Sequence, residues 1–231
     1  MATAVVTGAS RGIGEAISQR LLELGYNVIG ISRTINESPI HHPNFKALTC
    51  DLSDEKMTAS ILTLLSTDPS ITILCNVAGF GVFEPHEEIS PNTLSKMVTL
   101  NLTTPMILSN GLLRVLKFNE GIIFNITSIE ALRHSKFSAI YTATKAGLRA
   151  FSLSLFEEVR KSGVNVVSIN PDMTATSFFD ELRFGTSEEF DKRLEAEDIA
   201  DAVQNILQMR NGVAITDITI RPQKFGLEKK K

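Results

Sequence analysis

Short apolar runs alternate with amphipathic helical patterns along nearly the whole chain. Seven of these runs have the length of strands, and Val, Ile and Leu dominate them. Such alternation indicates parallel strands joined by crossover helices, and helices on both faces of a sheet explain strands that are apolar throughout. The sequence therefore predicts an α/β fold with a doubly wound, Rossmann-type sheet of seven parallel strands. The runs read TAVVT, NVIGIS, FKALTC, ITILCNVAG, GIIFNITS, VNVVSIN and DITIRP.

Long helical patterns occupy the second half of the chain. One covers Pro91–Lys117, with Ser90 as the expected N-cap and the proline at the first helical position. Two more cover Ser138–Ser162 and Glu197–Arg210. These helices are expected to cover the faces of the sheet.

The length of the chain is sufficient for one domain. A domain of 231 residues can bury roughly 70–75% of the surface of its unfolded chain. We expect a single domain over residues 1–231, with a polar and aromatic insertion at 171–196 between the sixth strand and the last helix. Residues 224–231, which end in LEKKK, are expected to form a solvated tail.

Charge and hydropathy limit the possible partners. Lys and Arg total 23 against 26 Asp and Glu, a net charge of −3, so we expect no nucleic-acid partner. No apolar stretch approaches the ~18 residues of a membrane span, and we expect no membrane partner. The first strand begins within a few residues of Met1, which predicts a cytoplasmic protein without a removable leader. Cys50 and Cys75 each follow an apolar run and are expected to be buried, reduced and without chemistry.

The segment TGASRGIG, at residues 7–14, lies between the first strand and the first helix. Glycine permits positive φ and a close approach of a ligand to the backbone, and a helix start offers free N–H groups to an anion. A phosphate is the first expectation. The glycines fall at Gly8, Gly12 and Gly14, a spacing that differs from the G-x-G-x-x-G fingerprint, so this motif alone does not identify the ligand.

Polar residues and glycines follow most of the other strands as well. The segments SRT, DLS, NVAGFG, SIEALRH and PDMTAT each begin where a predicted strand ends. Ligands of doubly wound sheets bind beyond the carboxyl ends of the strands. These segments are therefore expected to meet around one site.

Ser128, Tyr141 and Lys145 are the strongest candidates for catalysis. The spacing in YTATK places the tyrosine and the lysine on one face of a helix. An ammonium near a phenol favours the phenolate, so we expect the pKa of Tyr141 to be lowered from ~10 and the side chain to act as a general acid/base. Ser128 could hold a carbonyl oxygen beside it. Taken alone, a Y-x-x-x-K spacing is also typical of a surface pair.

The order and spacing of these features resemble the short-chain dehydrogenase/reductase family over nearly the whole chain. TGASRGIG resembles the T-G-x-x-x-G-x-G cofactor turn of that family, NVAG its N-x-A-G segment, and NPDMTAT its N-P-G-x-x-x-T stretch beside the nicotinamide. Asn101, Ser128, Tyr141 and Lys145 match its catalytic tetrad in sequence order. The cofactor-binding positions that follow are Gly8, Ser10, Arg11, Gly12, Ile13, Gly14, Arg33, Asp51, Leu52, Asn76, Ala78, Gly79, Tyr141, Lys145, Pro171, Thr174 and Thr176, and no metal site is expected.

The resemblance implies hydride transfer between a nicotinamide and a carbonyl or alcohol carbon. Tyr141 would protonate the oxygen, Ser128 would stabilise the developing oxyanion, and Lys145 would hold the nicotinamide ribose. Asn101 would order a water that connects the lysine to solvent, or it could merely cap a helix kink. Asp51 would contact the adenine or act as an N-cap, and Asn76 could be mainly structural.

The second strand ends without the acid that selects NAD. Such an acid lies about 20 residues beyond the glycine turn and binds the ribose 2′-OH. Here Ser32 stands at that position and Arg33 follows it, while Arg11 adds a second guanidinium from the glycine turn. Two guanidiniums suit a 2′-phosphate, so the sequence predicts NADP(H). Ser10 and Thr34 could add hydroxyl contacts.

Two positions depart from the family pattern. Asp172 stands where the N-P-G stretch usually has its glycine, which raises the question of whether the backbone there has positive φ. The chain also lacks the D-G-G ending found in many relatives near subunit contacts. Relatives usually pair through the helices that correspond to Pro91–Lys117 and Ser138–Ser162, so a homodimer or homotetramer is expected.

Apolar residues near the predicted site favour a hydrophobic substrate cleft. The favoured function is reduction of a ketone, diketone or 3-oxo compound to an alcohol by NADPH, and the alternative is a non-catalytic NADP(H)-binding regulator or scaffold. Arg133 and His134 could assist with an anionic substrate. The candidate cleft residues, about half of them expected in the core or an interface, are Phe80, Val82, Phe83, Ile129, Ala131, Leu132, Met173, Phe178, Phe179, Leu182 and Phe184.

Overall fold

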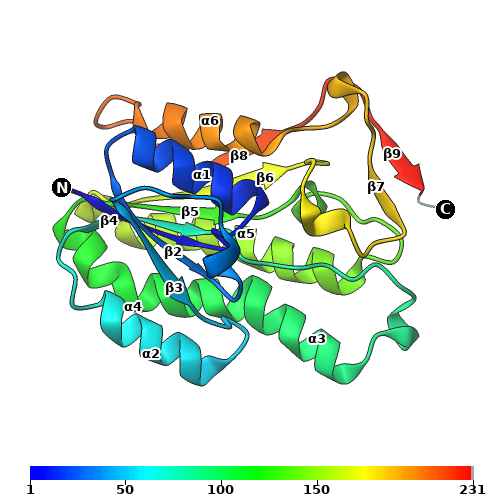
Figure 1. The fold of residues 1–231 in the computed structure, drawn as a ribbon, viewed down its shortest axis with the longest axis horizontal. Helices are drawn as coiled ribbons and strands as arrows, with labels where there is room; N and C mark the ends of the chain where they lie inside the picture. Colours follow the sequence, from blue (N-terminus) through cyan, green and yellow to red (C-terminus); the bar gives the residue numbers. More distant parts are fainter. Residues whose placement is uncertain (230–231) are drawn as a thin grey trace.

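A computed structural model describes residues 1–229, and it contains the predicted sheet of seven parallel strands in the order β3-β2-β1-β4-β5-β6-β8 (Figure 1). The order reverses at β1, so β1 and β4 border the crevice in which doubly wound folds bind their ligands. The fold class expected from the sequence is confirmed. The strands are β1 Thr3–Thr7, β2 Asn27–Ser32, β3 Phe45–Thr49, β4 Ile71–Asn76, β5 Ile122–Ile126, β6 Asn165–Pro171 and β8 Asp217–Ile220.

Helices cover both faces of this sheet. Figure 1 shows α1 and α6 on one face and α2, α4 and α5 on the other, with α3 continuing along α5. Each face has its own buried apolar cluster, one built on Ile17 and Ile199 and the other on Leu112 and Leu155. The helices are α1 Gly12–Glu23, α2 Glu55–Leu65, α3 Pro91–Val98, α4 Thr104–Phe118, α5 Ala139–Val159 and α6 Ala196–Leu207. Short 3₁₀ turns are η1 Ile35–Glu37, η2 His86–Glu88, η4 Ile129–Ala131, η5 Arg160–Ser162, η6 Ser177–Phe179 and η7 Phe190–Lys192.

The long helix expected over Pro91–Lys117 is divided in the structure. It begins as predicted, because Ser90 caps it by accepting a hydrogen bond from the backbone N–H of Thr93 at 3.1 Å. A π-helical turn, η3 Thr99–Thr103, then separates α3 from α4. Such insertions occur frequently at functional sites, and this one contains the buried Asn101.

The last helix differs from the prediction at its ends. α6 begins at Ala196, where Glu195 and Asp198 form a reciprocal capping box, and it ends at Leu207 instead of Arg210. Gly212 has a φ of +82° in the turn that follows.

The C-terminal segment, expected as a solvated tail, is largely exposed but contains a short strand. Leu227–Lys229 form β9, which pairs antiparallel with β7 Phe184–Thr186 from the insertion at 171–196 (Figure 1). β7 alone would expose a row of unpaired backbone groups, and β9 satisfies one edge of it. Lys230 and Lys231 lie outside the described residues.

Both cysteines are buried and free, as the sequence predicts. Burial raises the pKa of the Cys50 thiol to about 11 and raises the pKa of Cys75 as well, so neither forms a thiolate readily. Within residues 1–229, no helix is both long and apolar enough to cross a membrane.

Candidate active site

The glycine turn folds tightly between β1 and α1. Gly8 and Gly12 have φ values of +68° and +57°, which favour glycine. A Cβ on Gly14 would lie 2.2 Å from the carbonyl oxygen of Gly8, so a side chain there would displace the turn. The N-cap residue of α1, Arg11, makes no side-chain capping bond. The first N–H groups of α1 therefore remain available to an anion.

Thr7 connects this turn to the end of β4 by hydrogen bonds, a role that the sequence analysis missed. Its Oγ1 accepts hydrogen bonds from the backbone N–H groups of Val77 and Ala78 at 2.9 and 3.0 Å. Thr7 is the first residue of the TGASRGIG motif, so its place in the motif was a usable signal. The bonds fix the two borders of the central crevice relative to each other.

Three hydroxyl groups lie between the two candidate 2′-phosphate arginines. Ser10 Oγ lies 2.9 Å from Ser32 Oγ, and Thr34 Oγ1 lies 3.3 Å from Ser10 Oγ. Arg11 and Arg33 are both exposed and line the same cavity as these hydroxyls. The glycine turn and the end of β2 together therefore present two cations and a hydroxyl cluster where an NAD-selective site would present a carboxylate.

Asp51 lies beside the cavity and is not a helix N-cap. The N-cap of α2 is Asp54, whereas Asp51 accepts hydrogen bonds from the N–H and the hydroxyl of Ser53 at 2.9 and 2.7 Å. Burial acts to raise the pKa of Asp51, but these bonds and the charge of Arg33 outweigh it and lower the pKa below its ordinary value. Asp51 is therefore an ionised acceptor at neutral pH.

Ser128, Tyr141 and Lys145 converge at the carboxyl ends of β5 and β6. Ser128 directly follows β5, and the other two lie on the first turns of α5. The Nζ of Lys145 donates to the carbonyl oxygen of Ile126 at 2.9 Å and lies 5.8 Å from the centre of the Tyr141 ring. Tyr141 and Lys145 are both buried, and both line the cavity with Ser128. They form no exposed surface pair.

The pKa of Tyr141 shifts in the direction opposite to the prediction. Burial raises the pKa of the phenol above its ordinary value, the negative charge of Glu130 raises it further, and a hydrogen bond with Ser128 only partly offsets these effects. Burial also lowers the pKa of Lys145 to about 8. The prediction was wrong because desolvation of the buried phenol dominates its pKa, while the Lys145 ammonium donates its hydrogen bond to the carbonyl oxygen of Ile126.

Asn101 is buried in the π-helical turn and holds the loop after β4. Its Oδ1 accepts from the N–H of Phe80 at 3.0 Å, and its Nδ2 donates to the carbonyl of Phe80 at 2.8 Å and to Thr144 Oγ1 at 3.3 Å. A Cβ on Gly79 would lie 3.1 Å from Asn101 Oδ1 and 3.5 Å from Lys145 Nζ. The amide and the ammonium therefore border the same glycine, although Asn101 does not line the cavity.

Asn76 has a structural environment. Its Nδ2 donates to Asn125 Oδ1 at 2.8 Å, deep between β4 and β5, and its own Oδ1 is buried without a partner. It does not reach the cavity. The mainly structural alternative for Asn76 fits this environment.

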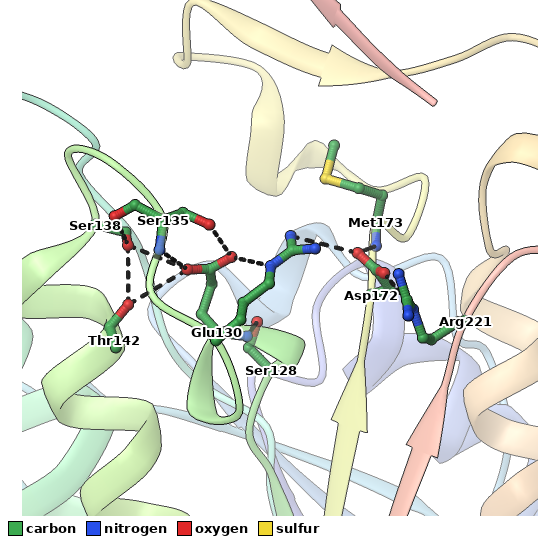
Figure 2. A network of polar contacts seen from close by, with 9 residues as sticks. Ser128, Glu130, Ser135, Ser138, Thr142, Asp172, Met173 and Arg221 are labelled. Atoms are coloured by element: carbon green, nitrogen blue, oxygen red, sulfur yellow. Dashed lines mark hydrogen bonds and ion pairs between the residues drawn. The ribbon is translucent and has the colours of Figure 1, made fainter. Parts of the chain in front are cut away.

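Asp172 does not adopt the left-handed backbone that its place in the N-P-G stretch suggested. Its φ is not positive, and its buried carboxylate is neutralised by two arginines instead. Arg221 Nε lies 3.0 Å from Oδ2 and Arg133 Nη2 lies 3.6 Å from Oδ1 (Figure 2). The carboxylate also accepts from the N–H of Met173 at 3.0 Å. The positive charges of Arg221 and Arg133 therefore offset the negative charge of Asp172 beside the cavity.

Glu130 is a buried acid that the sequence analysis did not single out. Figure 2 shows its carboxylate between Ser135, Ser138 and Thr142, whose hydroxyls donate to it, and Arg133 Nε donates at 2.6 Å. Although burial acts to raise its pKa, the bonds from Arg133 and the two serines lower it. Glu130 thus joins the turn that carries Ser128 to the start of α5, which carries Tyr141.

Aromatic rings surround the phenol. The Phe83 ring centre lies 5.2 Å from that of Tyr141, and Phe178 lies 5.8 Å from it. Phe184 packs edge-on against Phe83 at 5.1 Å. Of the expected cleft residues, about half line the cavity, namely Phe83, Ile129, Met173, Phe178, Phe179 and Phe184. Phe80, Val82, Ala131, Leu132 and Leu182 do not line it, and of the two cationic candidates Arg133 does and His134 does not.

One cavity of about 770 Å³ joins the glycine turn, the two arginines, Ser128, Tyr141 and Lys145. It runs from the arginines at the end of β2, across the glycine turn, to the phenol and the aromatic rings. Its size and its polar and apolar halves suit an extended cofactor together with a small substrate. The predicted site residues that line it are Gly8, Ser10, Arg11, Gly12, Ile13, Gly14, Arg33, Asp51, Leu52, Ala78, Gly79, Ser128, Tyr141, Lys145, Pro171, Thr174 and Thr176.

The fold and this cavity define a class of protein, the doubly wound α/β proteins with one ligand cavity at the carboxyl edge of the sheet, and here Ser128, Tyr141 and Lys145 line that cavity together. A family model described as short chain dehydrogenase matches residues 2–186. An uncharacterized oxidoreductase of Staphylococcus epidermidis is 33% identical over 226 residues, which cover 95% of this chain and 96% of that relative. An uncharacterized oxidoreductase of Staphylococcus aureus is 29% identical over the same coverage.

Solved structures agree with this assignment. An alcohol dehydrogenase from the archaeon Thermococcus sibiricus, complexed with 5-hydroxy-NADP, superposes with a TM-score of 0.87 at 25% identity over 97% of this chain and 98% of that chain. A metagenomic short-chain oxidoreductase in complex with NADP gives a TM-score of 0.78 at 28% identity over 96% of both chains. The protein belongs to the short-chain dehydrogenase family and is an oxidoreductase.

Proposed function

We propose that this protein reduces the carbonyl group of a ketone, diketone or 3-oxo compound to an alcohol with NADPH. The observation that carries the proposal is the single cavity that joins Ser128, Tyr141 and Lys145 to the glycine turn. A 3-oxoacyl thioester is one particular substrate to test, and a 3-hydroxy acid is another, for the oxidising direction. The reacting carbonyl would lie at the end of the cavity where the phenol faces the aromatic rings.

The residues along the cavity fit NADP(H). The glycine turn and the free N–H groups of α1 would receive the pyrophosphate, and Arg11 and Arg33 would receive the 2′-phosphate. The solved relatives that contain NADP or 5-hydroxy-NADP support this choice. When bound, the nicotinamide supplies the hydride that reduces the carbonyl carbon.

Tyr141 is the proton donor in the proposed reaction. Because burial raises its pKa, the phenol holds its proton at neutral pH and can deliver it to the substrate oxygen. Ser128 Oγ accepts from the N–H of Glu130 at 3.1 Å and also hydrogen-bonds with the phenol of Tyr141, so its hydroxyl lies where it would stabilise the negative charge that develops on the substrate oxygen. Two hydrogen-bonding groups would thus face one oxygen atom.

Lys145 and Asn101 would return the proton to Tyr141. The ammonium of Lys145, with its pKa near 8, exchanges protons close to neutral pH. Asn101 borders the same glycine as the ammonium, which supports its proposed role in ordering a water between Lys145 and solvent. The bonds from Asn101 to Phe80 equally fit a role in stabilising the helix irregularity.

We also propose a cytoplasmic homodimer or homotetramer. Two free cysteines fit a reducing compartment. α4 and α5, through which members of the family usually pair, cover one face of the sheet side by side. Light scattering on the purified protein would give the mass of the assembly, and a monomeric mass would contradict this part of the proposal.

Purified protein mixed with NADPH and a panel of carbonyl compounds tests the function. Loss of the nicotinamide absorbance with at least one ketone, diketone or 3-oxo compound is expected, with formation of the alcohol. A non-catalytic regulator or scaffold would bind NADPH without consuming it. Saturable NADPH binding together with no turnover across the panel would favour that alternative.

A further inference from the structure

The C-terminal segment lies against the substrate end of the cavity, and Leu227 lines the cavity with Tyr141. We infer that residues 221–229 form one wall of the substrate site and that Leu227 is a specificity-determining residue. The inference rests on the proposed function, since it concerns the carbonyl compound that the site would accept. It assigns a substrate contact to a segment far in sequence from the catalytic tetrad.

Two ion pairs hold the start of this segment in place. Arg221 Nε lies 3.0 Å from Asp172 Oδ2, directly after β6 (Figure 2). Three residues further on, Lys224 binds Asp191 twice, through its Nζ at 2.7 Å and through its backbone N–H at 2.8 Å to the carbonyl oxygen. Asp172 and Asp191 lie near opposite ends of the 171–196 insertion. The segment therefore spans the insertion.

Gly226 allows the closest approach between the two segments. A Cβ at this position would lie 2.6 Å from the Cβ of Lys192 and 2.9 Å from the Cβ of Ser187. These distances are too short for any side chain without a shift of the backbone. The glycine thus brings the chain into line with β7 just before β9 begins.

The register of β9 against β7 decides which side chains reach the cavity. Thr186 pairs with Leu227, and Gly185 pairs with Glu228. Directly opposed residues share a face of a sheet and successive residues alternate. Leu227 and Phe184 therefore lie on one face, and both line the cavity, although Leu227 is 44% exposed; Glu228, also exposed, lies on the other face and does not line it.

Phe184 connects this small sheet to the catalytic phenol. Its ring packs on Phe83 at 5.1 Å, and Phe83 packs on Tyr141 at 5.2 Å. Leu227 lies on the same face of the small sheet as Phe184 and lines the same cavity. The size of residue 227 should therefore set how large a group on the carbonyl carbon the site accepts.

Two opposite substitutions test the inference. Leu227→Ala should raise the ratio of kcat/KM for a bulky aryl ketone over a short 2-alkanone by about tenfold, and Leu227→Phe should lower that ratio, because methylene-sized changes in an apolar pocket shift selectivity to about this extent. The affinity for NADPH, measured by fluorescence titration, should remain that of the wild type in both variants.

Glu228→Ala is the matched control, because this residue lies in the same strand on the opposite face. It should leave the substrate ratio unchanged. If the wild type reduces ketones and Leu227→Ala behaves like Glu228→Ala, the inference is overturned while the proposed function remains. If the wild type reduces no carbonyl compound, the proposed function and the inference both fail.

Discussion

Burial moves the pKa values of Tyr141 and Lys145 in opposite directions. The phenol becomes a weaker acid, and the pKa of the ammonium falls to about 8. Lysine normally titrates slightly above tyrosine, but here Lys145 loses its proton first. The free enzyme therefore holds a protonated phenol over the whole range in which the lysine charge changes.

The pH profile of carbonyl reduction should show the titration of Lys145. We expect kcat/KM to be level at lower pH and to fall above about pH 8, because the neutral amine no longer stabilises the negative charge that develops on the phenol oxygen. Steady-state rates with NADPH at graded pH measure this. In Lys145→Arg, whose guanidinium keeps its charge, the decline should move to higher pH. An unchanged midpoint in that variant would argue against the assignment.

Lys145 should also reduce the stability of the fold. Its folded pKa lies below its unfolded value of 10.5, so the associated stability is present above pH 10.5 and is lost as the pH falls through 8. Lys145→Met should therefore raise Tm at pH 7 by about 2 °C or more, and the gain should shrink between pH 8 and pH 10.5. Thermal unfolding at several pH values measures it. Lys136→Met, at an exposed position, is the control, and a lower Tm for Lys145→Met would contradict the prediction.

At the scale of elements, the turn after β1 and the end of β2 act together. Arg11 comes from the first and Arg33 from the second, and the hydroxyls of Ser10 and Ser32 join the two segments at 2.9 Å. In the proposed NADP(H) site, both elements would be needed to surround the 2′-phosphate. The β1–β2 pairing of the parallel sheet sets the separation of the two guanidiniums.

Removing both guanidiniums should change the choice of cofactor. Arg11→Ala combined with Arg33→Ala is expected to weaken NADPH binding by at least about 100-fold, since each charge-assisted contact contributes about 1.5–3 kcal/mol, and to change NADH binding little. Fluorescence titration with both cofactors measures the difference. Arg160→Ala, beyond the end of α5, is the control, and equal losses for NADPH and NADH would remove the 2′-phosphate argument.

Local sequence patterns predict most of these elements and miss the ones that depend on distant contacts. Apolar runs predict the seven strands, and Ser90 with Pro91 predicts the start of α3. The π-helical turn has no such signal, because Thr99–Thr103 continues the helical pattern on both sides. β9 has no local signal either, because LEK does not alternate apolar and polar residues over the length of a strand. It pairs because β7 presents a free edge.

The candidate site shows the same division. Its glycines, hydroxyls and catalytic residues follow strands, so their common location follows from the topology of a parallel sheet. The environments of Glu130 and Asp172 could not be predicted in this way, because Arg221 lies 49 residues from Asp172 along the chain. The direction of the pKa shift of Tyr141 depends on burial, which the spacing of YTATK does not report.

At the scale of the whole molecule, one cavity crosses the carboxyl edge of the sheet from β2 to the small β7–β9 sheet. The polar half lies over the point where the strand order reverses, and the apolar half lies under the 171–196 insertion and the C-terminal segment. In the proposed function, this arrangement would place the cofactor and the substrate end to end, with Tyr141 between them. The account therefore depends on the phenol as the group that acts on the substrate.

Replacing the phenol hydroxyl tests this claim most directly. Tyr141→Phe keeps the ring and its contacts with Phe83 and removes only the oxygen, so NADPH binding should persist while kcat for carbonyl reduction falls by about 10²–10⁴-fold. Tyr26→Phe, which alters the other tyrosine of the chain, should retain full activity. Turnover by Tyr141→Phe at the wild-type rate would contradict the mechanism.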